Sequence, residues 1–267
     1  MNGGFLAGAP HALAWLDAVQ TRRSRRSFDG RRADDDALAA LQAHVDAFRP
    51  FEAARVVLLP EAPQSLFLGI VGSYGGISKA PSALAFVGRT SEPGVQAAVG
   101  YTGEAAVLEA TRLGLGSCWV GGFFSAPKGA LLAGAQPGER VFAVSPLGYP
   151  EARVGAKERI VYGFGRPKSR KDVEEFAPGV GSWPAWAQAA AAAVKVAPSA
   201  MHRQPWMLRM HGDSLVIGCQ GPDTPKVSKR LDCGIAMLHA ELGALGAGVT
   251  GEWELLTGDD VGRFTPR

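Results

Sequence analysis

The spacing of apolar residues along the first half of the chain predicts helices alternating with short strands. Helices are expected from His11 to Gln20 and from Asp34 to Phe48, since apolar residues there recur at three- and four-residue spacing. A third, amphipathic helix is expected from Tyr101 to Leu113, ended by Gly114 and Gly116 and followed by the strand-like run SCWV. Short apolar runs bounded by Pro or Gly predict further strands, at 55–59, 83–87 and 141–144.

The second half repeats this alternation after a polar connector that contains GRPKSRKDVEEF. A helix is expected from Trp186 to Val196, followed by a hairpin, WMLRMHGDSLVIG, that turns at Gly212 and Asp213. A helix from Gly234 to Gly246 and a last strand in VTGEWEL complete the series. The pattern therefore predicts an α+β fold in which helices pack on short strands.

Two segments of the chain are similar to each other. Glu109 to Gly116 aligns with Glu241 to Gly248, and the two segments share Glu, Leu, Gly and Gly at the same four places. Helix ends commonly carry Leu-Gly, so both chance and an internal duplication explain the match at this point. A duplication would give two related halves packed on each other.

Composition and charge narrow the class of protein. The chain has 267 residues, is 46% apolar and carries a net charge of +3, which is far from the basic face that nucleic-acid binding needs. No apolar run approaches the roughly 20 residues that span a bilayer, and the N-terminal segment lacks a signal-peptide pattern, so we expect a cytoplasmic protein without membrane contact. Cys118, Cys219 and Cys233 share no metal or disulfide spacing, and we interpret them as buried small apolar residues.

The most basic stretch is TRRSRRSF, from Thr21 to Phe28. Arg22, Ser24 and Arg26 alternate, so in an extended segment they point to one side, and two guanidinium groups flank a hydroxyl. This pattern suits a phosphate monoester. A solvated helix end and a nucleic-acid patch are the alternatives.

A turn is predicted where APSAMHRQPW follows an alanine-rich helix. Pro198 cannot continue the helix, and Ala197 before it is pushed out of the helical region, so backbone N–H groups are left without helical partners. Such a turn is either capped locally or binds a ligand.

Three motifs together resemble the FMN-dependent nitroreductase superfamily. TRRSRRSF is similar to its RRSxRxF opening, GLGSCWVGGF to its glycine-rich segment, and APSAMHRQPW to its APSxxNxQPW signature. In most members the Pro-Ser turn precedes the glycine-rich segment, whereas here it follows both other motifs. The chain thus resembles the single-chain type, in which residues 1–165 and 166–267 form one compact pseudo-dimer with nitroreductase-like fold, related halves and short antiparallel sheets. The resemblance implies one composite flavin site and a monomer in solution.

The resemblance also implies a set of cofactor-binding residues. The arginine motif would hold the FMN phosphate, helped by the KSR segment, the glycine-rich segment would approach the ring, and the Pro-Ser turn would form the opposite wall. The set comprises Arg22, Arg23, Ser24, Arg26, Trp119, Gly121, Gly122, Lys168, Arg170, Pro198, Ser199, Ala200 and His202. His202 stands where the family has Asn, so it is a candidate ring or substrate contact. The alternatives are a solvated linker for Lys168 and Arg170, a plain turn for the glycines and a core position for Trp119.

The activity that the resemblance implies is oxidoreduction through FMN, with ping-pong hydride transfer from NADH or NADPH to a nitroaromatic, a quinone or a similar small acceptor. No protein side chain is expected to act as a covalent catalyst, and no metal is expected. The alternatives are a flavin-binding or flavin-sensing protein without turnover, and a reductive dehalogenase or flavin-degrading enzyme that uses the same site.

Overall fold

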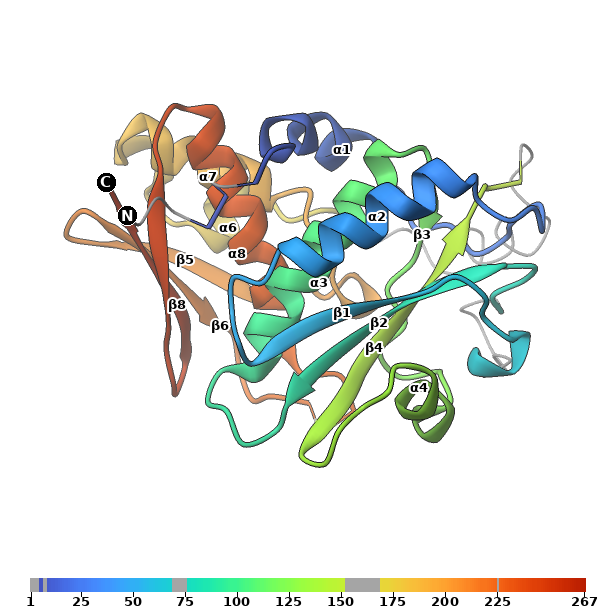
Figure 1. Ribbon diagram of the computed structural model, residues 1–267. Helices are drawn as coiled ribbons and strands as arrows, with labels where there is room; N and C mark the ends of the chain where they lie inside the picture. The colour runs from blue at the N-terminus through green and yellow to red at the C-terminus, as the bar shows by residue number, and fades with distance from the viewer. Residues whose placement is uncertain (1–4, 7–8, 69–75, 152–168, 225) are drawn as a thin grey trace.

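The computed structural model describes residues 5–6, 9–68, 76–151, 169–224 and 226–267 (Figure 1). The first series of elements is η1 (Ala12–Ala14), α1 (Trp15–Thr21), α2 (Asp35–Ala47), β1 (Ala54–Leu59), η2 (Gln64–Leu66), β2 (Ser82–Arg89), α3 (Val95–Arg112), β3 (Gly116–Ser117), α4 (Ala126–Leu132) and β4 (Glu139–Gly148). The second series is α6 (Val173–Phe176), η3 (Val180–Ser182), α7 (Ala185–Val194), η4 (Ala200–His202), β5 (Trp206–His211), β6 (Ser214–Cys219), α8 (Lys229–Gly246), β7 (Gly251–Leu255) and β8 (Asp260–Pro266).

The strands form two antiparallel sheets with the same topology. The first has the order β1-β2-β4-β3 and the second the order β5-β6-β8-β7, so each strand of one sheet has a counterpart in the other. Along the chain, helix α3 lies between β2 and β3, and helix α8 lies between the matching strands β6 and β7. The fold is therefore α+β, as predicted, with helices packed on two short antiparallel sheets.

The matching helices also fix the register of the internal similarity. Helix α8 begins and ends 134 residues after α3, since 95 corresponds to 229 and 112 to 246. Each helix is followed by a left-handed glycine, Gly114 with φ of 78° and Gly248 with φ of 81°. The alignment of Glu109 with Glu241, 132 residues apart, is thus two residues out of register. The sequence match paired Gly114, which follows the end of α3, with Gly246, which still lies within α8.

Helices α3 and α8 cross at the centre of the molecule with their backbones in contact (Figure 1). A Cβ atom on Gly100 would lie 2.1 Å from the carbonyl oxygen of Leu231, and one on Gly234 would lie 2.0 Å from that of Ala97. No residue with a side chain fits at either position without separating the helices. The two glycines therefore set how closely the two series of elements pack.

The main apolar core surrounds this crossing and includes residues of α1, α2, α3, α7 and α8 together with one face of each sheet. Every residue of α3 from Ala97 to Ala110 is buried, so the prediction of an amphipathic helix is wrong here. The helix is covered by α8, α1, α2 and the first sheet, and a helix enclosed on all sides has no solvent face to mark with polar residues. A second apolar cluster covers the other face of β2 and β4.

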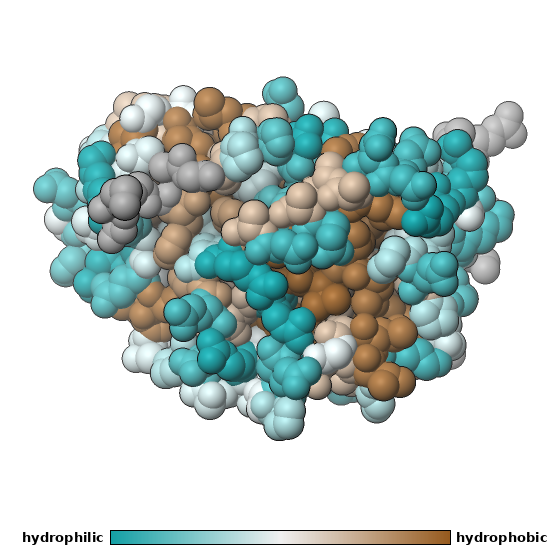
Figure 2. Space-filling model, in the orientation of Figure 1, coloured by the Kyte–Doolittle hydropathy of each residue, from teal (hydrophilic) through white to brown (hydrophobic). Residues whose placement is uncertain are grey.

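The remaining differences from the sequence predictions are local. Of the SCWV run, only Ser117 lies in the two-residue strand β3, and Val120 adds an isolated bridge to Val144. Helix α4 and strand β8 were not predicted, so VTGEWEL is not the last strand. In the view of Figure 2, apolar surface gathers over the first sheet and around α4, which exposes Leu131 and Leu132. Within the described ranges, every helix is too short or too polar to cross a bilayer.

Candidate functional site

The arginine motif leaves helix α1 as an extended segment that runs beside the glycine-rich segment. Arg22 caps the helix with φ of −53° and ψ of 129°, which starts the extended course. Ser24 then forms a parallel bridge with Ser117 of β3, and the backbone N–H of Arg25 donates to the carbonyl oxygen of Ser117 over 2.8 Å. The motif is therefore extended, as its alternating pattern requires, and two of the three motifs lie side by side.

Arg22 and Arg23 have different environments. The Arg22 side chain is only 7% exposed, and its Nε lies 3.8 Å from Oε1 of Glu104. Its Nη1 is buried and has no hydrogen-bond acceptor among the described residues. Arg23 is exposed, and its Nη1 donates to the carbonyl oxygens of Gln20 and Arg22, both over 2.8 Å. A buried guanidinium nitrogen without an acceptor is costly, and an anion bound there would satisfy it.

Arg170 joins this group from the second series of elements. Its Nη1 donates to the carbonyl oxygens of Lys195, over 2.8 Å, and Ala197, over 2.9 Å. Burial lowers the pKa of Arg170, and the charges of Arg22 and Arg23 lower it further. Three guanidinium groups thus repel one another close to the residue that precedes Pro198. Lys168 lies outside the described residues.

A buried polar network lies beneath the arginine motif. Trp119 Nε1 donates to Glu104 Oε2 over 2.7 Å, and the indole stacks on Phe86 with ring centroids 4.1 Å apart. Nε2 of His239 lies 3.1 Å from Glu104 Oε1, and its Nδ1 lies 3.2 Å from the carbonyl oxygen of Ala193. Glu104 and His239 are fully buried. Neither residue was among the predicted site residues, although a Glu within an apolar central helix was a signal for Glu104.

The glycine-rich segment contacts the second series of elements. A Cβ atom on Gly121 would lie 3.0 Å from Cγ1 of Val227, and one on Gly122 would lie 3.5 Å from Val227 Cγ2. The carbonyl oxygen of Val227 accepts from Nη2 of Arg203 over 2.9 Å, and Arg203 belongs to the APSAMHRQPW motif. Val227 therefore connects the glycine pair to the Pro-Ser turn.

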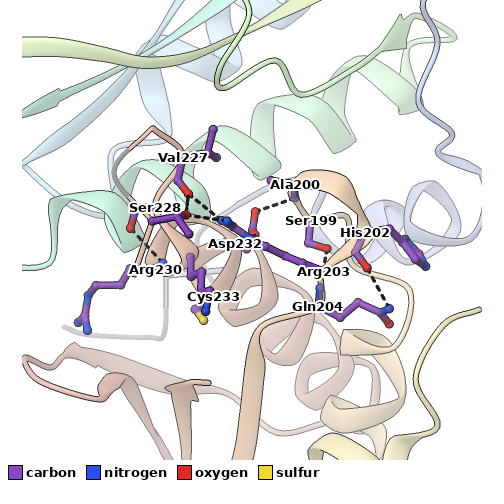
Figure 3. Close-up of polar contacts among 12 residues, drawn as sticks. Ser199, Ala200, His202, Arg203, Gln204, Val227, Ser228, Arg230, Asp232 and Cys233 are labelled. Carbon is purple, nitrogen blue, oxygen red and sulfur yellow. Dashed lines mark hydrogen bonds and ion pairs between the residues drawn. The ribbon is translucent and has the colours of Figure 1, made fainter. Parts of the chain in front are cut away.

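The Pro-Ser turn is capped by its own neighbours (Figure 3). The backbone N–H of Gln204 donates to Ser199 Oγ over 2.9 Å, and that of Ala200 donates to Asp232 Oδ1 over 3.1 Å. Arg203 Nε donates to the second oxygen of Asp232 over 2.6 Å. Burial raises the pKa of Asp232 to about 6, against the opposing effects of Arg203 and the Ala200 N–H. The turn is therefore capped locally. Asp232 could not be found from the motif, because it lies 32 residues after Ala200, in helix α8.

Three residues of the turn have backbones in the left-handed region that disfavours side chains. They are Met201, His202 and Gln204, with φ of 52°, 56° and 46°. Such conformations cost about 1–3 kcal/mol each and occur mainly at functional sites, where surrounding contacts maintain them. In Figure 3 the His202 imidazole points away from Asp232. Asp232 therefore binds the Ala200 N–H and the Arg203 side chain without contacting this ring.

A match to a protein family shows to which family the chain belongs. The family model described as "Putative TM nitroreductase" matches residues 15–244. The chain belongs to this nitroreductase family.

One solved structure shares the fold of the chain, and two others resemble part of it. A putative nitroreductase from Thermotoga maritima is 20% identical with a TM-score of 0.63, over 94% of this chain and 92% of that chain. A nitroreductase with bound FMN from Bacteroides fragilis is 19% identical with a TM-score of 0.41, over 53% of this chain and 95% of that chain. A putative NADH oxidase from Clostridium acetobutylicum is 20% identical with a TM-score of 0.39, over 51% and 89%. No curated protein matched the sequence.

The fold brings most of the sequence-predicted site residues into one region. The charges of Arg22 and Arg23 lower the pKa of Arg170, and Arg170 donates to the carbonyl oxygen of Ala197, next to Pro198. Ser24 runs beside the glycine-rich segment, and Arg26 continues that edge, with its carbonyl oxygen accepting from the Ser78 N–H over 2.9 Å. Trp119 is partly buried and joined to Glu104, so it has both a core contact and a place beside the arginine motif.

Proposed function

We propose that the chain is an FMN-dependent oxidoreductase that takes hydride from NADH or NADPH and passes it to a nitroaromatic, a quinone or a similar acceptor in a ping-pong cycle. The observation that supports this most is the gathering of Arg22, Arg23 and Arg170 beside the Pro-Ser turn in a chain of the nitroreductase family. FMN, when bound, would supply the hydride chemistry.

The residues present fit the phosphate of FMN. A phosphate monoester carries nearly two negative charges and three acceptor oxygens, which match several guanidinium donors. Arg22 offers a buried Nη1 that has no acceptor among the described residues, and Arg170 has its pKa lowered by burial and by the other two arginines. An anion there would relieve both the unsatisfied donor and the repulsion. We propose that Arg22, Arg23, Ser24, Arg26 and Arg170 hold this phosphate, with Lys168 as a further cation.

The remaining site residues would surround the ring. Gly121 and Gly122 would present backbone without side chains, and Pro198, Ser199 and Ala200 would form the facing wall. Two hydrogen bonds hold that turn, from the Ala200 N–H to Asp232 and from the Gln204 N–H to Ser199 Oγ. His202 would contact the ring or the substrate from the strained turn. Asn can donate and accept together, whereas each nitrogen of a neutral imidazole does one, so this contact differs from that of most relatives.

Titration of the apoprotein with FMN tests the site directly. We expect about one FMN per chain, because the arginine motif and the Pro-Ser turn each occur once. Arg22→Ala and Arg26→Ala should each weaken FMN binding by about 10- to 150-fold, the equivalent of a charge-assisted hydrogen bond of about 1.5–3 kcal/mol. Arg32→Ala is the matched control, since Arg32 is exposed and pairs with Asp35. Unchanged affinity in both motif variants, or two FMN per chain, would contradict the composite site.

Turnover is tested separately from binding. Anaerobic addition of NADH or NADPH to the FMN-loaded protein should bleach the flavin absorbance, and a nitroaromatic or quinone should restore it. Bound flavin that neither nucleotide bleaches would favour the alternative of a flavin-binding or flavin-sensing protein. Reductive dehalogenation or flavin degradation would appear instead as halide release or loss of the isoalloxazine after reduction.

We also propose that the two series of elements, residues 1–165 and 166–267, act as a pseudo-dimer and that the chain is a cytoplasmic monomer. Helices α3 and α8 bury their faces against each other within one chain, and the main core continues through both. A surface that an ordinary relative would bury between subunits is thereby covered. Light scattering on the FMN-loaded protein should give one chain per particle, and a stable dimer that loses flavin on dissociation would contradict this.

A further inference from the structure

A pair of cysteines lies in the second series of elements, away from the arginine motif. Cys219 ends strand β6 and Cys233 lies in the second turn of helix α8, which packs on that strand. Sγ of Cys233 lies 3.7 Å from the carbonyl oxygen of Gly218, the neighbour of Cys219 in β6, and the largest influence on the pKa of each of the two thiols is its interaction with the other. The two sulfur atoms are therefore neighbours in the fold, although 13 residues separate them in the sequence.

The two thiols differ in their access to solvent. Cys233 is fully buried, whereas Cys219 is partly exposed and lines a surface cavity of about 400 Å³ together with Gly221, Pro222, Arg230 and Asp259. The prediction that all three cysteines are buried is thus wrong for Cys219. Cys219 is the last residue of β6, where the second sheet ends, and its side chain borders this cavity.

The charges around Cys219 favour its thiolate. The hydrogen bond from Cys233 lowers the pKa of Cys219, and the cations of Lys229 and Arg230 lower it further, while burial and Asp223 oppose them. Both cations lie in the first turn of α8, whose N-terminal end adds a positive partial charge. The pKa of Cys233 is raised, first by its hydrogen bond to Cys219 and then by burial. A partly exposed thiol with a lowered pKa beside a buried thiol with a raised pKa is the arrangement of a reactive and a resolving cysteine.

We propose that Cys219 and Cys233 form a reversible dithiol–disulfide couple, in which Cys219 reacts with a hydroperoxide and Cys233 resolves the product. The Cys219 sulfur attacks one oxygen of hydrogen peroxide, the O–O bond breaks, and hydroxide leaves to take a proton, which makes a sulfenic acid and water. The Cys233 sulfur then attacks the Cys219 sulfur, the S–O bond breaks, and its oxygen leaves as water with the Cys233 proton. Two thiols are oxidised by two electrons and one peroxide is reduced to two waters. A dithiol reductant reverses the couple.

Both cysteines lie next to residues that contact the Pro-Ser turn. Cys233 is adjacent to Asp232, whose carboxylate binds the Ala200 N–H and Arg203 in the Pro-Ser turn. On the other side, the N–H of Gln220, which follows Cys219, donates to the carbonyl oxygen of Pro205 over 2.7 Å. A disulfide would therefore form between two segments that both contact the motif APSAMHRQPW.

Peptide mapping of the whole protein tests this couple without any variant. Trypsin leaves the three cysteines on separate peptides, spanning residues 113–128, 210–226 and 231–263. After reduction, removal of the reductant, one equivalent of hydrogen peroxide and alkylation, we expect peptides 210–226 and 231–263 joined with the loss of two hydrogens. Cys118, which is buried, should remain a free thiol and serves as the internal control. Joined peptides that include Cys118, or no joined peptides while Cys219 is recovered as thiol or sulfinic acid, would overturn the proposal.

Two variants assign the roles. In Cys233→Ala the reaction should stop at the sulfenic acid of Cys219, which a cyclic 1,3-diketone traps, and in Cys219→Ala the thiol of Cys233 should survive peroxide. Alkylation of the wild-type protein at neutral pH should be at least about tenfold faster at Cys219 than at Cys118, because exposure and thiolate character both favour it. Equal alkylation rates, or diketone labelling at Cys233 in place of Cys219, would show the assignment to be wrong.

Discussion

Replacing Gly234 by Ala tests the close contact between helices α3 and α8. The new Cβ atom would lie 2.0 Å from the carbonyl oxygen of Ala97 and 2.7 Å from its Cα, whereas ordinary contacts begin at about 3.4 Å. These neighbours are backbone atoms of a buried helix, so no side chain can rotate away. The helices must separate by roughly the missing 1.4 Å, the difference between 3.4 and 2.0 Å, and this loosens the core on both sides.

The expected loss of stability follows from two opposing effects. Overpacking a core costs about 1–3 kcal/mol, and contact with backbone places this site at the upper end. Replacing a helical glycine by alanine returns up to about 1 kcal/mol. Gly234→Ala should therefore lower the free energy of unfolding by about 2 kcal/mol, and Gly100→Ala should do the same from the opposite helix, where the added Cβ would lie 2.1 Å from Leu231 O.

Urea unfolding followed by far-ultraviolet circular dichroism measures this change. Gly246→Ala is the matched control on the same helix, because its added Cβ would meet only the end of the Leu16 side chain at 3.3 Å. The control should be as stable as the wild type or slightly more stable. If Gly234→Ala proved as stable as Gly246→Ala, the helices would not be in backbone contact and this account of the crossing would be refuted.

Three further predictions concern buried titratable groups, each measured against pH. Burial raises the pKa of Glu241 to about 7, so the folded protein keeps a proton that the unfolded chain loses near 4.5, and the stability that Glu241 contributes should fall as the pH rises through this window. The difference in urea-unfolding free energy between the wild type and Glu241→Gln should show this slope. Burial lowers the pKa of His44 from 6.5 to about 4, so the stability that His44 contributes should fall on acidification through that range, and the difference between the wild type and His44→Phe should show the opposite slope. Asp232→Asn should lower stability by up to about 3 kcal/mol, because it breaks a largely buried pair with Arg203. Burial raises the pKa of Asp232 from 3.8 to about 6, so the stability that this carboxyl contributes falls as the pH rises through that range, and the loss should be larger at about pH 4 than at about pH 7. A pH-independent loss would contradict the raised pKa.

Local signals accounted for most of the elements and for the extended arginine motif. Apolar spacing, Pro and Gly boundaries and the Gly212–Asp213 turn depend on neighbouring residues, so the hairpin of β5 and β6 could be predicted with its register. Helix α3 shows where local reasoning fails, since its burial on every side depends on elements far away in the sequence.

The candidate site could be predicted in part for the same reason. Arg22 and Pro198 belong to contiguous motifs, whereas the groups that hold them are distant: Glu104 beside Arg22, and Asp232 beside the Pro-Ser turn. A single buried carboxylate in a helix has no local signature that separates it from a solvated one. Its partners become visible only when the helices are packed. The reactive character of Cys219 was missed likewise, because exposure at a strand end depends on the surrounding loops.

Positions 134 residues apart in α3 and α8 match in the fold but can carry different side chains. Glu104 and His239 form a buried polar pair, and the same shift maps them onto Leu238 and Ala105, which are both fully buried and apolar. Two identical subunits related by a twofold axis would have to place every such pair twice. In this chain, one pair of matching positions holds a buried polar pair while the other holds hydrocarbon. Because both series of elements belong to one polypeptide, matching positions can carry different side chains, and a buried polar pair is built once instead of twice.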